Sequence, residues 1–234
     1  MKKLISAGIF LAFLITNAQA QLLNNILNKV NKPGSSLSTA DIAEGLRQAL
    51  QTGTDRSVQT LSVTDGFFAN ATVKILMPEE AKKVEQKLRA VGLGEQVDQT
   101  ILSMNRAAED AAKTAAPIFL NAIKQINFQD AAGILRGGDF AATEFLKNKT
   151  SAELSFAFKP IIEASLNKFN VNQYWNTLFI TYNKFSFNKV NPDLQAYVTE
   201  KALTGIFYQI GLEEQKIRKD PAARTTDLVK QVFK

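Results

Sequence analysis

The longest stretch of regular hydrophobic spacing runs from residue 95 to about residue 126, and it constrains the fold more than any other feature. Its apolar positions are Val97, Ile101, Met104, Ala108, Ala111, Ala115, Ile118 and Ala122. Alternating steps of four and three predict a helix packed lengthwise on another helix, and the many alanines predict a close approach. Pro117 cannot donate a hydrogen bond to the carbonyl of Lys113, so we expect a kink there.

Helix start and stop signals divide the rest of the chain. Ser38 with Asp41 three positions later, and Pro78 with the acidic residues after it, are typical helix starts. On this basis helices are expected over residues 38–53, 56–61, 78–92, 95–126, 129–135, 140–146, 152–169 with a break at Pro160, 193–217 and 228–233. The sequence therefore predicts an all-α, single multi-helix domain with a long kinked central helix and at most one short extended segment near residues 73–77.

The first twenty residues have the pattern of a cleavable secretion signal. Lys2 and Lys3 precede an apolar run over residues 4–15, and Ala18-Gln19-Ala20 places small residues where a signal peptidase cuts. An N-terminal membrane anchor is the alternative, but it needs about 20 apolar residues and this run is shorter. We expect a mature protein that begins at Gln21, without a cysteine there for a lipid anchor: exported, periplasmic or secreted, and soluble, with no transmembrane segment after cleavage.

The residues that follow the signal divide into two parts. Residues 21–36 carry an apolar face over residues 22–30 and then a Pro-Gly-Ser break, which is typical of a flexible tether. Docking of this segment on the domain, or disorder, is favoured over a membrane-surface helix, because such helices usually carry several basic residues and an aromatic one. Residues 37–234 are expected to form the single helical domain.

Composition excludes several kinds of catalytic and binding site. The chain contains no cysteine and no histidine, which excludes disulfides, thiolate nucleophiles, Ser-His-Asp triads and the usual zinc sites. We therefore expect no metal site and no cofactor. The net charge of +6 falls to +4 when the two lysines of the signal are removed, and the remaining charges are interspersed. This distribution argues against a nucleic-acid partner.

Aromatic residues are concentrated between residues 156 and 187, which hold nine of the 21 in the chain (16 Phe, 4 Tyr and 1 Trp). One helical face of this region carries Tyr174, Trp175, Leu178, Phe179 and Tyr182. The favoured interpretation is that this face is part of the core, because aromatic side chains dominate core burial. The alternative is that it lines a pocket for an apolar, lipid-like ligand.

Several motifs resemble one family. They are Leu37-Ser38-x-x-Asp41-Ile42 with Gly45-Leu46 and Ala49-Leu50, Met104-Asn105-Arg106-Ala107-Ala108-Glu109, Phe158-Lys159-Pro160-Ile161, Tyr197-Val198-Thr199 with Ala202-Leu203, and Ile217-Arg218-Lys219-Asp220-Pro221-Ala222-Ala223-Arg224-Thr225-Thr226-Asp227-Leu228. Over nearly the whole mature length, the chain is similar to the exported bacterial family called domain of unknown function 4197. The resemblance implies a helical, exported protein and brings no activity, substrate or catalytic residue with it.

Two of these motifs contain candidate residues for a polar site. The candidates are Asn105, Arg106, Glu109, Arg218, Asp220, Arg224 and Asp227. In one interpretation they are a helix cap and exposed ion pairs, namely Arg106 with Asp110, Glu109 with Lys113, and Arg224 with Asp227. In the other, the two segments meet in the fold, with Arg106 facing Asp220 or Asp227 and Glu109 facing Arg224.

Three classes of function remain open at this point. The favoured one is a non-enzymatic binding protein for an apolar molecule or for an envelope partner. The second is a structural or assembly role in the cell envelope. The third is an enzyme that uses Glu109, Asp220 or Asp227 as acid, base or metal ligand, which would require a concave site around the carboxylates.

Overall fold

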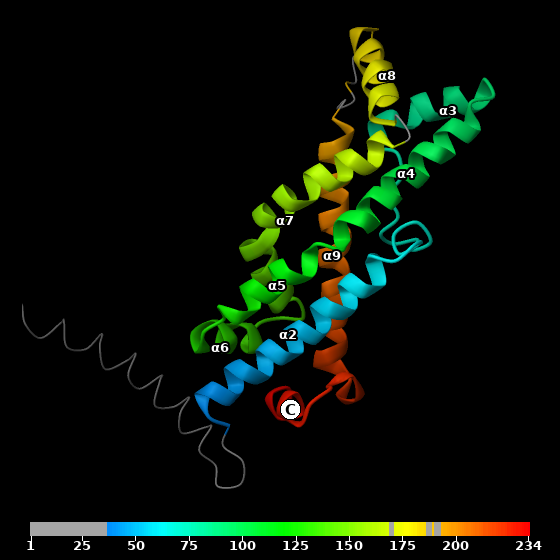
Figure 1. Ribbon diagram of the computed structural model, residues 1–234. Coiled ribbons are helices and arrows are strands. Elements are labelled where there is room, and N and C mark those ends of the chain that lie inside the picture. The colour runs from blue at the N-terminus through cyan, green and yellow to red at the C-terminus, as the bar shows by residue number, and fades with distance from the viewer. Residues whose placement is uncertain (1–36, 169–170, 186–188, 190–192) are drawn as a thin grey trace, which may run out of the picture.

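The computed structural model describes residues 37–168, 171–185, 189 and 193–234, and every regular element in this part of the chain is helical (Figure 1). The α-helices are α2 (Thr39–Leu61), α3 (Lys82–Ala90), α4 (Gly94–Ala112), α5 (Ala115–Lys124), α6 (Phe128–Arg136), α7 (Ala141–Asn167), α8 (Val171–Phe185), α9 (Leu194–Lys219) and α10 (Asp227–Val232), with 3₁₀ turns η1 (Glu79–Ala81) and η2 (Pro221–Ala223). The predicted all-α class, with a single multi-helix domain, is confirmed.

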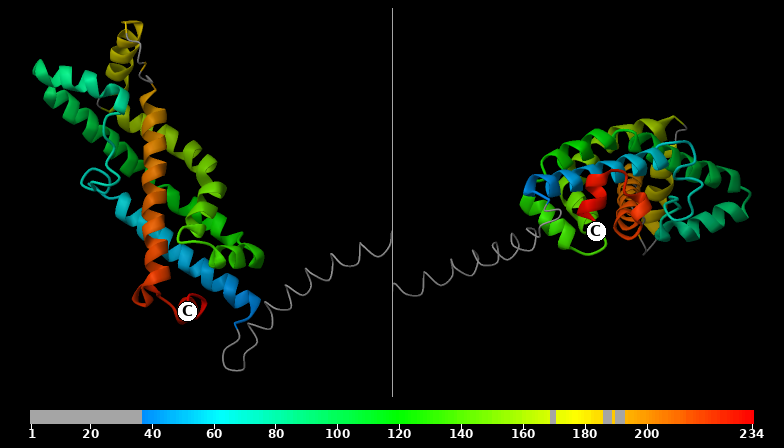
Figure 2. Two further views of the ribbon diagram at one scale, coloured as in Figure 1. Left: turned by 180° about the vertical axis from the view of Figure 1, so that it is seen from behind. Right: turned by 90° about the horizontal axis from the view of Figure 1, so that it is seen from below.

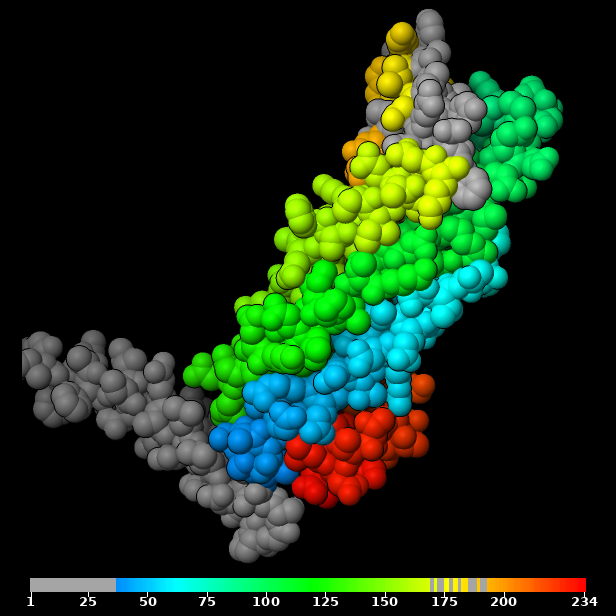
Figure 3. Space-filling view, viewed as in Figure 1, coloured from blue at the N-terminus to red at the C-terminus, as the bar shows by residue number. Residues whose placement is uncertain are grey.

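The long helices pack side by side along an elongated molecule. Helix α9 contacts α7, α2 and α4, and α4 also packs against α7 (Figure 2). Helix α3, the start of α4, and α8 lie at one end of the molecule, whereas α6, η2 and α10 lie at the other (Figure 1). Figure 3 shows the C-terminal residues against the first half of α2, where Val232 and Leu228 contact Gly45.

The predicted caps start the helices where the sequence placed them. The Ser38 hydroxyl accepts the N–H of Asp41, whose carboxylate in turn accepts the N–H of Ser38, so both orphan donors are satisfied. Asp193 caps α9 by accepting the N–H of Ala196. Within the described residues, no helix combines the length and the hydropathy needed to cross a membrane.

The central helix is broken where a kink was predicted. Helix α4 ends at Ala112 and α5 begins at Ala115, and the two follow one another along nearly the same line (Figure 1). Pro117 is therefore the third residue of α5, where a missing N–H leaves no intrahelical hydrogen bond unmade. The apolar seam that predicted this region is buried from Val97 to Ile118.

Three predicted breaks are absent. Helix α2 continues through Gly53, which faces α9 with its Cβ position 3.6 Å from the Cβ of Glu213; close packing outweighs the roughly 1 kcal/mol propensity penalty of glycine. Helix α7 spans 27 residues, so it continues both through residues 147–151, where a gap between two helices was expected, and through Pro160. Pro160 is exposed, and so is Phe156 one turn before it, so water can satisfy the carbonyl that the proline leaves free.

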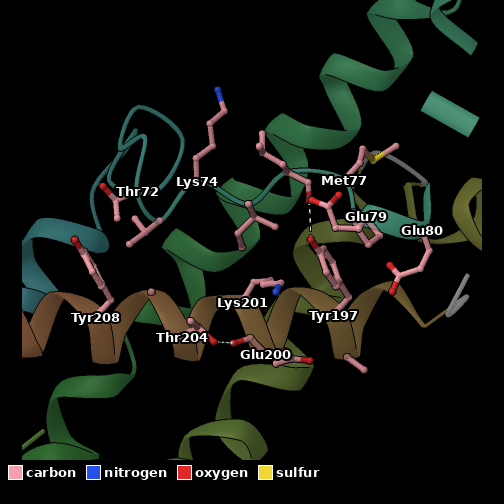
Figure 4. Close-up of a pocket in the computed structure, with 16 residues that line it drawn as sticks. Thr72, Lys74, Met77, Glu79, Glu80, Tyr197, Glu200, Lys201, Thr204 and Tyr208 are labelled. Carbon is pink, nitrogen blue, oxygen red and sulfur yellow. Dashed lines mark hydrogen bonds between the residues drawn. The ribbon is translucent and has the colours of Figure 1, made fainter. Parts of the chain in front are cut away.

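The predicted extended segment has no strand partner among the described residues. Val73, Ile75 and Met77 are buried, whereas Leu76 is 52% exposed, which is the alternation of an extended chain with one face on the core. The segment crosses from α2 to η1 and runs beside α9 (Figure 4).

Candidate functional site

Two cavities lie on either side of Met77. The α9 groove, of about 650 Å³, lies between residues 72–80 and α9 (Figure 4). The Trp175 cavity, of about 540 Å³, lies at the end of the molecule formed by α3, α4 and α8. Both volumes are within the range of pockets that bind small molecules in proteins, about 300–1,000 Å³.

The Trp175 cavity is mainly apolar. Its apolar lining consists of Met77, Leu88, Leu93, Val97, Val171 and Trp175, and its polar lining of Glu95, Gln96, Gln99 and Thr100. Leu93 is 40% exposed at the start of α4, so apolar surface reaches the solvent there. A cavity with an apolar lining and a few polar groups suits an apolar or amphiphilic ligand.

The residues predicted to line an apolar pocket divide between this cavity and the core. Trp175 lines the cavity and is 3% exposed, whereas Phe179 is fully buried in the core. Their ring centroids are 4.4 Å apart, and Tyr182 packs edge-on against Phe179. The side chains of Tyr174 and Leu178 lie outside the described set. The sequence did not single out the α3 and α4 residues of the lining, because nothing local joins them to α8.

The α9 groove is a trough between an extended segment and one face of a helix. Tyr197, Lys201, Thr204 and Tyr208 line it from α9, at spacings of three and four residues that place them on one side. The Tyr197 hydroxyl donates a hydrogen bond to the Leu76 carbonyl at 2.8 Å and so bridges the trough (Figure 4). Two features noted in the sequence lie here: the motif beginning at Tyr197 and the predicted extended segment near residues 73–77.

Acidic groups dominate the end of the α9 groove near Tyr197. Burial, and after it the negative charges of Glu80, Glu200 and Glu79, together raise the pKa of Tyr197 to about 12. The Lys201 ammonium lies 5.5 Å from the centroid of the Tyr197 ring. This end of the groove therefore favours a positively charged group.

The candidate residue Asn105 is fully buried and ties the extended segment to α4. Its Oδ1 accepts the N–H of Ile75 at 2.8 Å, and its Nδ2 donates to the carbonyls of Ile75 and Ile101 at 2.8 and 2.7 Å. Three of the four hydrogen bonds available to this amide are thus made to the backbone. Asn105 positions residues 73–77 and does not line either cavity.

Glu109 and Arg106 hold the preceding loop in the same way. One oxygen of Glu109 accepts the N–H groups of Phe67 and Phe68, each at 3.1 Å, and the other pairs with Arg106 at 2.7 Å. Arg106 also pairs with Asp65 at 2.7 Å, and Asp65 has a left-handed φ of 70°. This buried carboxylate therefore fixes a strained loop.

The C-terminal candidates close the opposite end of the molecule. Arg218 pairs with the buried Glu214 at 2.8 Å and donates to the Ile134 carbonyl at 2.9 Å. Arg224 donates to the carbonyls of Ile217 and Arg218 at 3.0 and 2.9 Å, which satisfies the last turn of α9. These contacts attach α6 and the C-terminal segment to the last turns of α9.

Asp220 and Asp227 have local partners. Asp220 caps η2 by accepting the N–H of Ala222 at 2.9 Å, as the cap interpretation predicted. Asp227 pairs with Lys230 at 3.0 Å, and its side chain is 88% exposed. Neither carboxylate lines the α9 groove or the Trp175 cavity, and neither does Glu109.

The two polar motifs occupy separate places along α9. Phe67, whose N–H is bound by Glu109, contacts Gly205, and Arg218 lies thirteen residues or about 20 Å further along the helix. The predicted contacts of Arg106 with Asp220 or Asp227, and of Glu109 with Arg224, are therefore wrong. The exposed pairs proposed instead also differ: the observed pairs are Arg106 with Glu109, Lys113 with Asp110, and Lys230 with Asp227.

Comparison with known proteins identifies the family but no function. No curated protein and no solved structure gave a significant match. A family model described as "Protein of unknown function (DUF4197)" matches residues 36–234. This range includes the caps, the loop-binding motif of α4 and the C-terminal motif described above. The chain therefore belongs to the DUF4197 family.

Proposed function

We propose that this protein is an exported, non-enzymatic binding protein that holds an apolar or amphiphilic molecule in the Trp175 cavity. The observation that carries the proposal is the lining of this cavity, in which six apolar side chains surround a volume of about 540 Å³. Burial of apolar ligand surface contributes about 25 cal/mol per Å², so a cavity of this kind can bind such a molecule without catalytic groups.

The placement of the candidate carboxylates supports binding over catalysis. Glu109 is used to hold a loop, Asp220 caps a turn, and Asp227 is exposed beside Lys230. A carboxylate enzyme would place such groups together in a concave site. Export is the second part of the proposal, and the pattern of the first twenty residues supports it.

Trp175 allows binding to be measured directly, because it is the only tryptophan in the chain. We expect its emission to shift when dodecanoic acid or a lysophospholipid enters the cavity beside it. We also expect organic extraction of the purified protein, followed by mass spectrometry, to release an apolar molecule. If extraction yields nothing and a panel of fatty acids and phospholipids leaves the emission unchanged, the proposal is wrong.

A pair of matched variants separates binding in this cavity from adsorption elsewhere. Leu93→Glu places a charge at the edge of the Trp175 cavity, whereas Leu212→Glu places one on α9 outside it. Both leucines are 40% exposed. We expect Leu93→Glu to weaken ligand binding and Leu212→Glu to leave it unchanged. Equal effects of the two substitutions would place the ligand outside the Trp175 cavity.

A further inference from the structure

The α9 groove presents one free edge of an extended chain. In such a chain the N–H and C=O of one residue point to one edge, and those of the next residue point to the other. Asn105 takes both polar groups of Ile75 on the side of α4. The N–H of Lys74 donates to the Asn70 carbonyl at 2.8 Å, so the groups that face α9 are the C=O of Lys74 and the N–H and C=O of Leu76. The hydrogen bond from Tyr197 to the Leu76 carbonyl agrees with this (Figure 4).

This edge has unused hydrogen-bonding capacity. In the part of the chain that the structure describes, the N–H of Leu76 and the C=O of Lys74 have no hydrogen-bond partner. An extended edge with free N–H and C=O groups is the feature to which a further strand adds. The Asn105 amide already occupies the opposite edge in the manner of a neighbouring strand.

The dimensions of the groove fit a short extended peptide. Tyr197 and Tyr208 line it eleven residues apart on α9, which corresponds to about 16 Å. Five residues of extended chain have about the same length. Between the two tyrosines, Gly205 is buried, and its Cβ position is 2.6 Å from the Phe67 ring, so the missing side chain lets Phe67 pack against α9 at this point.

The two ends of the α9 groove differ in charge. Glu79, Glu80 and Glu200 gather at the end near Tyr197, with Lys201 as the nearest basic residue of the lining on α9. The opposite end is lined by the uncharged Thr72 and Tyr208, and the basic Lys74 lies beside Thr72 (Figure 4). A bound peptide is therefore complementary when its positive charge lies at the Tyr197 end.

We propose that the α9 groove binds an extended segment of a partner protein, about five residues long, which pairs with the free edge at Lys74 and Leu76 and places a basic residue beside Glu79, Glu80 and Glu200. The site is separate from the Trp175 cavity, so it gives the protein a second kind of partner.

The probes are two capped, fluorescein-labelled pentapeptides, Lys-Thr-Val-Thr-Val and Val-Thr-Val-Thr-Lys, which cover both strand directions. Fluorescence anisotropy with the purified protein should show saturable binding of at least one. Replacing the lysine of that peptide by glutamate should weaken binding, and so should N-methylation of the backbone amides. Hydrogen exchange at the Leu76 amide should slow in the complex. If neither peptide binds saturably, or if the Leu76 amide exchanges at an unchanged rate, the proposal is overturned.

A matched pair of substitutions tests the location. Thr204→Trp fills the groove, whereas Thr60→Trp is made on the exposed face of α2. Both threonines are exposed and donate to the carbonyl four residues earlier, Glu200 for one and Arg56 for the other, so the two changes are equivalent for the helix. We expect Thr204→Trp to abolish peptide binding and Thr60→Trp to preserve it. Binding that survives Thr204→Trp would rule out the α9 groove as the site.

Discussion

Asn105 hydrogen-bonds both the backbone N–H and the C=O of Ile75, and so does for an extended segment what a neighbouring strand does in a sheet. Helical packing gives no such partner to residues 73–77, whose inner face is buried. A buried backbone group without a partner costs about 1–3 kcal/mol. One amide side chain on α4 therefore makes a non-helical segment compatible with an all-α domain. The other edge of that segment faces the α9 groove.

Replacing Asn105 by leucine should destabilise the protein. Leucine keeps the branched shape and the number of side-chain heavy atoms, but the N–H and C=O of Ile75 lose their partner, at about 1–3 kcal/mol for each buried group left unsatisfied. Each kcal/mol corresponds to about 2–4 °C in Tm for a protein of this size. Thermal unfolding followed by circular dichroism measures the change. Asn121→Leu, at an exposed position of α5, is the control and should leave the Tm within a degree or so of the wild type.

The helices were predictable because their signals are local. The Ser38 capping box, the caps at Asp193 and Asp220 and the apolar seam of α4 are each contained in a few residues or in one periodic pattern. The errors at Gly53 and Pro160 have a common cause. Propensity disfavours both residues in a helix, whereas packing on α9 in one case and solvent exposure in the other decide the outcome.

The candidate polar residues were recognised, but their partners were not. Asn105 and Glu109 bind backbone groups of residues 67, 68 and 75. Every residue has such groups, so the sequence does not indicate which of them a side chain will bind. The acceptors of Arg224 are carbonyls for the same reason. Pairing one charged motif with the other was a natural inference from charge alone, and it failed because each motif is satisfied by the main chain beside it.

Tyr197 should titrate at unusually high pH. Burial, with the charges of Glu80, Glu200 and Glu79, raises its pKa from 10 to about 12. Because the folded state holds this proton more tightly, the associated stability is present below pH 10 and is lost as the pH rises from 10 to about 12. Ultraviolet titration of the wild type minus Tyr197→Phe should show one ionisation near pH 12. A difference curve centred at pH 10 would contradict the placement of Tyr197 against Leu76.

Export should be accompanied by a single cut. Because small residues occupy positions 18 and 20, we expect the cell-envelope form to begin at Gln21, and intact-mass measurement with N-terminal peptide mapping tests this. Replacing Ala18 and Ala20 by arginine should leave the precursor uncut, while the same replacement at Gln19 serves as the control. Recovery of envelope protein that still carries Met1 would exclude a cleaved signal.

The adjacent residues Glu213 and Glu214 should differ strongly in their response to the same substitution. Glu214 accepts the N–H groups of Ala142 and Thr143 at 2.9 and 2.8 Å, and so caps α7 while it pairs with Arg218. Its replacement by glutamine removes the charge and turns amide hydrogens toward one of these two donors. Breaking a buried pair of this kind costs about 3–5 kcal/mol.

Glu213 is buried to a similar degree, but its Oε2 has no hydrogen-bond partner and lies 3.5 Å from Arg56, whose side chain is 39% exposed. Glu213→Gln relieves an incompletely satisfied buried charge, so the free energy of unfolding should change by less than about 1 kcal/mol. Urea unfolding of both variants under identical conditions gives the comparison. Equal destabilisation by the two substitutions would show that burial of the charge, and not the cap on α7, sets the contribution of Glu214.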